Sequence, residues 1–130
     1  MLNDVVLEGL VVKTWRYMED LLFRVACYRD PDLPAKPNGL LHDAADFVTV
    51  RVIKGSLGAP VSVEKGAILR VHGFLQSRDY SETLADFLKD AQGASLDVPE
   101  GLDPQDLAAP RTTTEIIARR IMRISQPSRR

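Results

Sequence analysis

Cysteine and histidine are scarce in this chain of 130 residues, which holds one cysteine, Cys27, and two histidines. A single cysteine excludes an internal disulfide framework. The chain has no CxxC pair, so the usual spacing of a zinc site is missing as well. We therefore expect no metal, no cofactor, and a fold stabilised by packing.

Long apolar runs are also missing. No run approaches the roughly 18 residues that a membrane-spanning helix needs. Residues 1–12 have neither the basic start nor the small-residue cleavage site of a secretory signal. We expect a cytoplasmic protein without a membrane segment. Apolar residues make up 45% of the chain and charged residues 27%, which is typical of one folded domain of this length.

Enzyme signatures are absent too. There is no GxSxG motif, and Cys27 falls in the inward row of a predicted strand, where a buried thiol is the ordinary case. His42, Asp43 and Asp46 are either acid–base or metal-binding groups or the solvated residues of a polar loop. No second cluster with ligand spacing accompanies them, which favours the polar loop. We expect no catalysis.

The net charge of −1 conceals an uneven distribution. Residues 1–80 hold ten basic and ten acidic side chains, residues 81–110 hold one and seven, and residues 111–130 hold six and one. A basic end beside an acidic segment is typical of an interaction feature, although solubility alone explains it equally well.

Alternating apolar and polar residues predict five strands. They cover residues 3–13, with a bend or bulge at Gly9, then 21–28, 47–54, 68–80 and 115–124. The rows expected to face inward are Phe23, Val25 and Cys27; Val48, Val50 and Val52; and Leu69, Val71, Gly73 and Leu75. Prolines make residues 30–46 a long loop.

Residues 81–110 form an acidic insertion. Four apolar residues at helical spacing predict a short helix, with Ser81 as its N-cap and Gly93 beyond its end. They are Leu84, Phe87, Leu88 and Ala91. Later prolines predict an extended linker to the last strand. We thus expect a single domain over residues 1–130, ending in a flexible basic tail at 125–130.

Five strands, the first interrupted by glycine, favour a small closed barrel over a sandwich, because closure removes exposed edges. We predict an all-β protein with the five-stranded Greek-key barrel of the oligonucleotide-binding (OB) fold, and a short helix between strands four and five. The ligand face of that fold is formed by strands two and three with two loops.

Aromatic and arginine side chains alternate on the predicted outer faces. Rings stack on unpaired bases for roughly 1–3 kcal/mol, and arginines bind the phosphates. The candidate nucleic-acid-binding residues are Trp15, Arg24, Tyr28, Phe47, Arg51, Arg70, Phe74, Arg78 and Tyr80. In the alternative interpretation, the rings cover an apolar layer or a subunit interface, the arginines lie on a solvated face, and Trp15 closes the barrel end.

Five segments, in order and spacing, carry a family resemblance: NDVVLEGLVVKTWRYM, LLFRVACYRD, DFVTVRVI, VEKGAILRVHGFLQSRDYSE and TTTEIIARRIMRI. The chain resembles bacterial single-stranded DNA-binding proteins. The resemblance implies sequence-independent binding that protects single strands in replication, repair or recombination, with stacking on Phe47 and Tyr80 and a basic residue, Arg78, nearby. It also implies a homodimer or homotetramer in the bacterial cytoplasm, at the nucleoid. RNA binding is equally compatible with stacking platforms.

Two segments depart from that family. Residues 55–66 contain glycines and a proline where the family has a helix, and this connection is similar to that of primosomal replication protein N. The sequence ends in the basic ISQPSRR, where the family has an acidic, phenylalanine-tipped tail that recruits other proteins. Tail-mediated recruitment is therefore in question. The alternative function is a primosome-type OB protein, or a protein-interaction scaffold without strong DNA binding.

Overall fold

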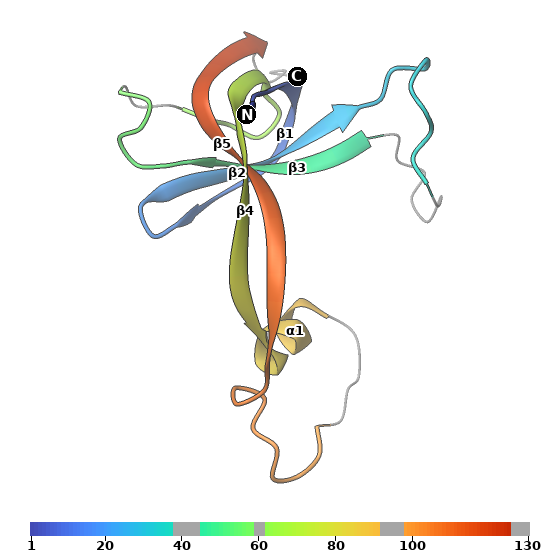
Figure 1. Cartoon of the computed structure of the whole chain (residues 1–130), viewed down its shortest axis with the longest axis vertical. Helices are drawn as coiled ribbons and strands as arrows, with labels where there is room; N and C mark the ends of the chain where they lie inside the picture. The colour runs from blue at the N-terminus through green and yellow to red at the C-terminus, as the bar shows by residue number, and fades with distance from the viewer. Residues whose placement is uncertain (38–44, 59–61, 92–97, 126–130) are drawn as a thin grey trace. The chain divides into compact units, whose positions relative to one another are not determined.

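A computed structural model describes residues 1–37, 45–58, 62–91 and 98–125. Its elements are β1 (Val5–Tyr17), β2 (Asp20–Tyr28), β3 (Ala45–Val52), β4 (Ile68–Thr83), α1 (Leu84–Asp90) and β5 (Ala108–Ser125) (Figure 1). All five predicted strands and the helix are confirmed. The strands β4 and β5 are longer than predicted, and the described residues between β3 and β4 contain turns but no helix.

The five strands form a closed barrel in the order β1-β2-β3-β5-β4. The first half of β1 pairs antiparallel with β4 and its second half with β2, so β1 belongs to both neighbours. Strand β2 pairs antiparallel with β3, and β3 pairs parallel with β5. This strand order and closure confirm the predicted OB fold.

Strand β1 changes neighbours near Gly9. A Cβ atom at Gly9 would lie 2.5 Å from the carbonyl oxygen of Ala26. The backbones of β1 and β2 can therefore come this close only because glycine has no side chain. The predicted bulge lies elsewhere: pairing shifts between Val11 and Lys13, which leaves Val12 as the extra residue. The bend or bulge predicted at Gly9 is therefore not a bulge, and Gly9 serves close packing.

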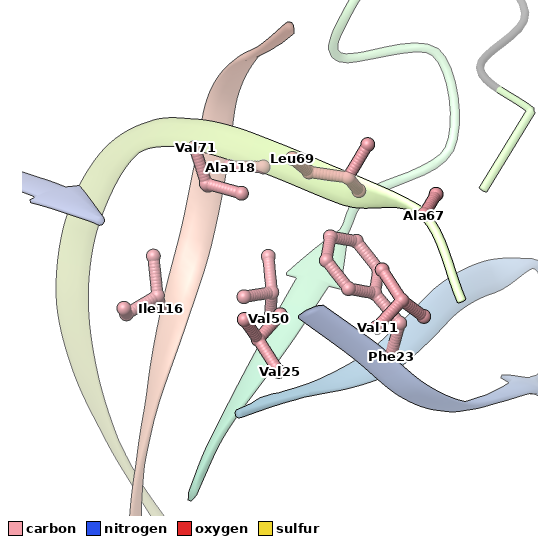
Figure 2. Packing of buried hydrophobic residues seen from close by; sticks show 9 residues of the cluster. All are labelled: Val11, Phe23, Val25, Val50, Ala67, Leu69, Val71, Ile116 and Ala118. Atoms are coloured by element: carbon pink, nitrogen blue, oxygen red, sulfur yellow. The ribbon is translucent and has the colours of Figure 1, made fainter. Parts of the chain in front are cut away.

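Apolar side chains from all five strands and from Ala67 meet inside the barrel (Figure 2). The cluster consists of Val11, Phe23, Val25, Val50, Ala67, Leu69, Val71, Ile116 and Ala118. The inward rows predicted for β2 and β3 are confirmed, since their other members, Cys27, Val48 and Val52, pack against this cluster. Leu75 was wrongly predicted to face inward: it is 47% exposed, because β4 continues past the core beyond Gly73.

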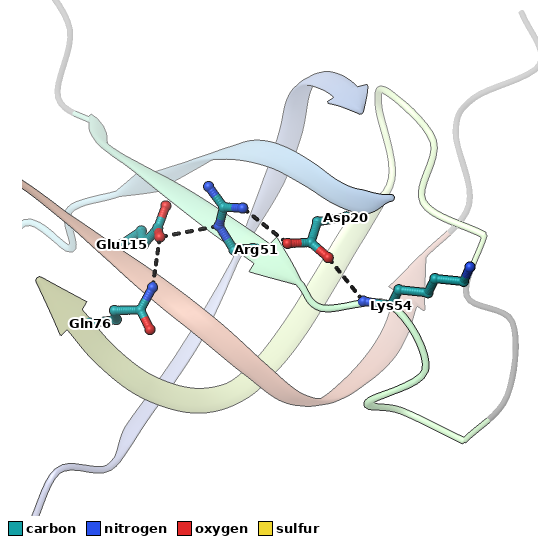
Figure 3. Close-up of polar contacts among 5 residues, drawn as sticks. All are labelled: Asp20, Arg51, Lys54, Gln76 and Glu115. Carbon is teal, nitrogen blue, oxygen red and sulfur yellow. Dashed lines mark hydrogen bonds and ion pairs between the residues drawn. The ribbon is translucent and has the colours of Figure 1, made fainter. Parts of the chain in front are cut away.

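A polar network joins four of the strands (Figure 3). Arg51 Nε donates to Glu115 Oε1 at 3.1 Å, and Arg51 Nη1 donates to Asp20 Oδ2 at 3.0 Å. Gln76 Nε2 donates to the same Glu115 oxygen at 3.0 Å. The Glu115 side chain is only 2% exposed. Because buried charge is tolerated only when it is paired and hydrogen-bonded, each charge of this network depends on its partners.

Residues Ser77–Thr113 form a second compact unit, here called the β4–β5 unit. The N-cap of α1 is Thr83, so the prediction of Ser81 was wrong. The Thr83 hydroxyl accepts from the Asp86 N–H at 3.0 Å, and the Asp86 carboxylate accepts from the Thr83 N–H at 3.4 Å. Ser81 has a leucine three residues later and cannot form this capping box.

The segment before β5 is bonded to α1. The N–H groups of Leu84 and Ala85 donate to the carbonyls of Leu107 at 2.9 Å and Pro104 at 3.2 Å, which satisfies two free donors of the helix start. Part of the segment predicted to be an extended linker is therefore fixed to the start of α1 by these two hydrogen bonds. Gly93 and the predicted tail after Ser125 lie outside the described residues. Over the described ranges, no helix has the length and apolar character needed to cross a membrane.

Candidate nucleic-acid interface

The cross-strand register defines one outer face of β1, β2 and β3. Residues directly opposite each other on paired strands point to the same face. Three rows follow: Trp15, Leu22 and Arg51; Lys13, Arg24 and Thr49; Ala26 and Phe47. Four of the predicted residues, Trp15, Arg24, Phe47 and Arg51, thus share this surface with Lys13. We call it the β1–β3 face.

Two cations lie over the ring of Phe47. The Arg24 guanidinium carbon is 5.5 Å from the ring centroid, and Lys36 Nζ is 5.6 Å from it. Lys36 also donates to the carbonyl of Ala45 at 2.8 Å, which fixes the loop residue beside β3. Within the described residues, neither cation forms an ion pair with a carboxylate. Arg24 also donates to the Thr49 hydroxyl at 3.4 Å, and the charge of Lys36 helps to lower the pKa of Asp46. Neither contact neutralises the cation as a close ion pair would.

Trp15 provides a second ring on the same face. Lys13 Nζ lies 5.4 Å from its ring centroid. Trp15 opposes Leu22 in the register and is outside the core cluster. Although Leu22 points to the outer face, it is buried at 4% exposure, so its neighbours on this face cover it. The structure thus places Trp15 on the outer face.

An ion pair occupies the end of β2 and the start of β3. Arg29 donates to both Asp46 oxygens, at 2.7 and 2.9 Å, and to the carbonyl of Pro34 at 2.7 Å. The hydrogen bond from the guanidinium lowers the pKa of Asp46 below its ordinary value. Arg29 is thereby neutralised, whereas its neighbour Tyr28, a predicted binding residue, is 66% exposed.

Removing this carboxylate should change how stability depends on pH. Because Arg29 lowers the pKa of Asp46 in the folded state, the pair stabilises the fold above the ordinary aspartate pKa of 3.8, and the contribution is lost as pH falls through the lowered pKa. We expect Asp46→Asn to be less stable than the wild type in urea unfolding at neutral pH, with the difference vanishing in strong acid. Asp32→Asn, an exposed control in the same loop, should behave like the wild type. An Asp46→Asn deficit of equal size at both pH values would contradict this role.

Arg51 and Arg70 have different environments from those predicted. Arg51 lies on the outer face, but Glu115 and Asp20 hold its guanidinium in the buried network. Arg70 pairs with Glu8 across β4 and β1 at 2.9 Å, with both side chains about half exposed. Since both guanidiniums already bind carboxylates, we leave them out of the proposed interface.

The remaining predicted residues lie on β4. Arg119 is 5.0 Å from the ring centroid of Phe74, a contact between β5 and β4. Arg78 is 5.5 Å from the ring centroid of Tyr80 in the β4–β5 unit. Tyr80 borders a hollow that is also lined by Glu82, Asp86 and Asp90. Such carboxylates repel phosphates. The binding roles of these three predicted residues stay predictions.

The sequence-based prediction missed Lys13 and Lys36, although a pattern that indicates Lys13 exists. Lys13 precedes Trp15 by two residues, and this spacing puts both on one face of a strand. Lys36 is the only Lys or Arg between Asp30 and Asp46. Its contact with Phe47 follows from the loop conformation, which has no sequence period.

The groups considered for catalysis do not come together in the described part of the chain. His42 and Asp43 lie outside the described residues, and Asp46 is bound to Arg29. Across the described ranges, no three His, Cys, Asp or Glu side chains form a possible metal site. Burial, and to a lesser extent the Asp46 carboxylate, raises the pKa of Cys27, so its thiol is protonated at neutral pH.

The barrel and the β1–β3 face together define an OB-fold domain whose outer sheet carries aromatic rings with cations over them. Mitochondrial single-stranded DNA-binding protein Rim1 of Saccharomyces cerevisiae superposes with a TM-score of 0.52 and 11% identity, over 97% of this chain and 98% of that one. Plasmodium falciparum SSB, solved in complex with single-stranded DNA, gives 0.55 and 16%, over 96% and 97%. No protein-family model and no curated protein sequence matches the chain. At these identities the likeness is one of fold, and in fold the expected resemblance to single-stranded DNA-binding proteins is confirmed.

Proposed function

We propose that this protein binds single-stranded DNA without sequence preference, on the β1–β3 face. The observation that carries the proposal is the ring of Phe47, which lies on the β1–β3 face with Arg24 and Lys36 over it. Among the described residues, no carboxylate forms an ion pair with either cation. Unpaired bases have an apolar face for such a ring, and phosphates have the charge for such cations.

In binding, a base would replace the cation that lies over each ring. A base stacks on Phe47, and Arg24 and Lys36 move from the ring to the flanking phosphates. Trp15 with Lys13 repeats the arrangement. None of these contacts reads a base edge, so binding does not depend on sequence.

The cellular setting is part of the proposal. Protection of single strands in replication, repair or recombination, by a homodimer or homotetramer in the bacterial cytoplasm, is supported by the five resembling sequence segments. The two structural neighbours, one of them holding single-stranded DNA, support the same general activity. No step requires catalysis, a cofactor or an acidic tail.

Fluorescence anisotropy of a labelled oligo-dT, titrated with protein at several salt concentrations, tests the proposal. The oligonucleotide should have about 15 nucleotides, close to the span of one OB barrel. Three cations on the face predict a slope of about −2 in log K against log salt, from roughly 0.7 per phosphate neutralised. Duplex DNA of the same length should bind far more weakly.

An absence of dT binding at low salt would overturn the proposal and favour the scaffold alternative. A titration with oligo-U tests whether the protein prefers DNA to RNA. If oligo-U binds as tightly as oligo-dT, the protein binds single strands of either kind. A flat salt dependence would remove Lys13, Arg24 and Lys36 from the interface.

A further inference from the structure

The β4–β5 unit has an open apolar hollow of about 330 Å³ beside α1. Its walls include Leu84, Phe87, Leu107 and Ala109. Phe87 is 48% exposed and Leu107 is 45% exposed, so two large apolar side chains of one small unit are only about half covered by the described residues. Burying them would gain free energy from the hydrophobic effect.

The surroundings of this hollow are acidic. A second hollow, of about 340 Å³, shares Glu82 with the first and is also lined by Asp86 and Asp90. Across residues 77–113 there are eight acidic and three basic side chains, and one of the three, Arg111, is already paired with Glu82. An occupant of the apolar hollow therefore needs cationic residues beside its apolar ones.

The chain itself contains a segment of this character. Residues 119–130 hold five arginines and no acidic residue. On β5, Ile116 and Ala118 face the core and Ile121 packs against it, so the inward parity shifts by one residue between Ala118 and Ile121. Arg120, Met122 and Ile124 are exposed. Met122 is 42% exposed and Ile124 is 43% exposed. This outward row, two apolar residues preceded by an arginine, matches the hollow in both polarity and charge.

We propose that the apolar hollow of the β4–β5 unit binds the end of β5 from a second copy of this chain. Met122 and Ile124 of one copy cover Phe87 and Leu107 of the other. Arg119 lies over Phe74 and Arg123 is 3.9 Å from Glu64, so Arg120, Arg129 and Arg130 are the arginines that meet the carboxylates around the hollow. The two surfaces differ, so each contact joins the end of β5 of one copy to the hollow of another, and every copy carries both surfaces. It does not depend on DNA binding.

Sedimentation velocity over a range of protein concentrations tests this contact. The wild type should associate beyond any salt-independent oligomer, and the added association should weaken as salt rises. Two double variants of exposed residues, Phe87→Ser/Leu107→Ser and Met122→Ser/Ile124→Ser, should each lower the added association constant at least about tenfold. Far-UV circular dichroism confirms that both keep their strand content.

Mixing the two variants identifies the occupant. Each has one intact surface, so an equimolar mixture should form pairs that stop at two copies, while neither variant associates alone. A peptide of residues 119–130 should compete for the contact, and the same peptide with Met122→Ser and Ile124→Ser should not. Wild type without added association, variants that associate like the wild type, a loss in only one variant, or a mixture that forms no pairs would each overturn the proposal. Binding of the short oligo-dT by both variants keeps this test separate from that of DNA binding.

Discussion

Replacing Arg51 with methionine should lower the free energy of unfolding by about 3–5 kcal/mol, the usual cost of removing one partner from a buried ion pair. Methionine fills much of the same space but removes the guanidinium from the carboxylate of Glu115, which is 2% exposed and also accepts from Gln76 in the network of Figure 3. Urea denaturation followed by the fluorescence of Trp15 measures the change.

Arg70→Met is the matched control for this loss. Its pair with Glu8 has an equally short distance, 2.9 Å, but both side chains are about half exposed. Exposed pairs contribute about 0–1 kcal/mol. A further variant, Arg51→Met/Glu115→Leu, removes both charges and should regain most of the stability. If Arg51→Met cost no more than Arg70→Met, the network would have no special role.

Replacing Phe47 with alanine should weaken binding of a short oligo-dT by roughly 1–3 kcal/mol, the usual contribution of one stacked base. The side chain is only partly buried and lies outside the core cluster, so the barrel should remain folded. The variant also removes the ring that holds Arg24 and Lys36 in position. Anisotropy at fixed salt gives the change in affinity, and urea denaturation checks the fold.

Phe87→Ala controls for the loss of an exposed ring. Phe87 belongs to α1 in the β4–β5 unit and has no place in the proposed DNA interface. It should leave the affinity for the short oligonucleotide within about 0.5 kcal/mol of wild type, the size of a neutral surface change. Equal losses for Phe47→Ala and Phe87→Ala would show that the stacking assignment is wrong.

Local sequence patterns predicted the barrel well. Alternation along a strand depends only on neighbouring residues, and it correctly placed Phe23, Val25 and Val50 in the core. It also put Arg51 on the outer face, which the register bears out. It could not predict the burial of Arg51, because the residue that pairs with it, Glu115, is 64 positions away in sequence.

Other features were missed for different physical reasons. Leu75 continues the inward alternation of β4, but a strand can extend beyond the core that it packs on. Alternation does not show where that core ends. The N-cap at Thr83 was readable, since an aspartate stands three residues later. Of the two cations over Phe47, only Arg24 could be predicted, because alternation along β2 puts it on the outer face. Lys36 lies in a proline-rich loop whose conformation has no sequence period.

Because β3 pairs with β5, one edge of β3 stays unpaired during synthesis until the last strand of the chain has been made. Ribosomes add about 5–20 residues per second, so Glu115 follows Arg51 by roughly 3–13 s. Until β5 arrives, the β3 edge that will pair with Ile116 and Ile117 offers free hydrogen-bonding groups beside the apolar Val50. The nascent protein thus passes through a stage in which a holdase chaperone would have a defined strand edge to shield.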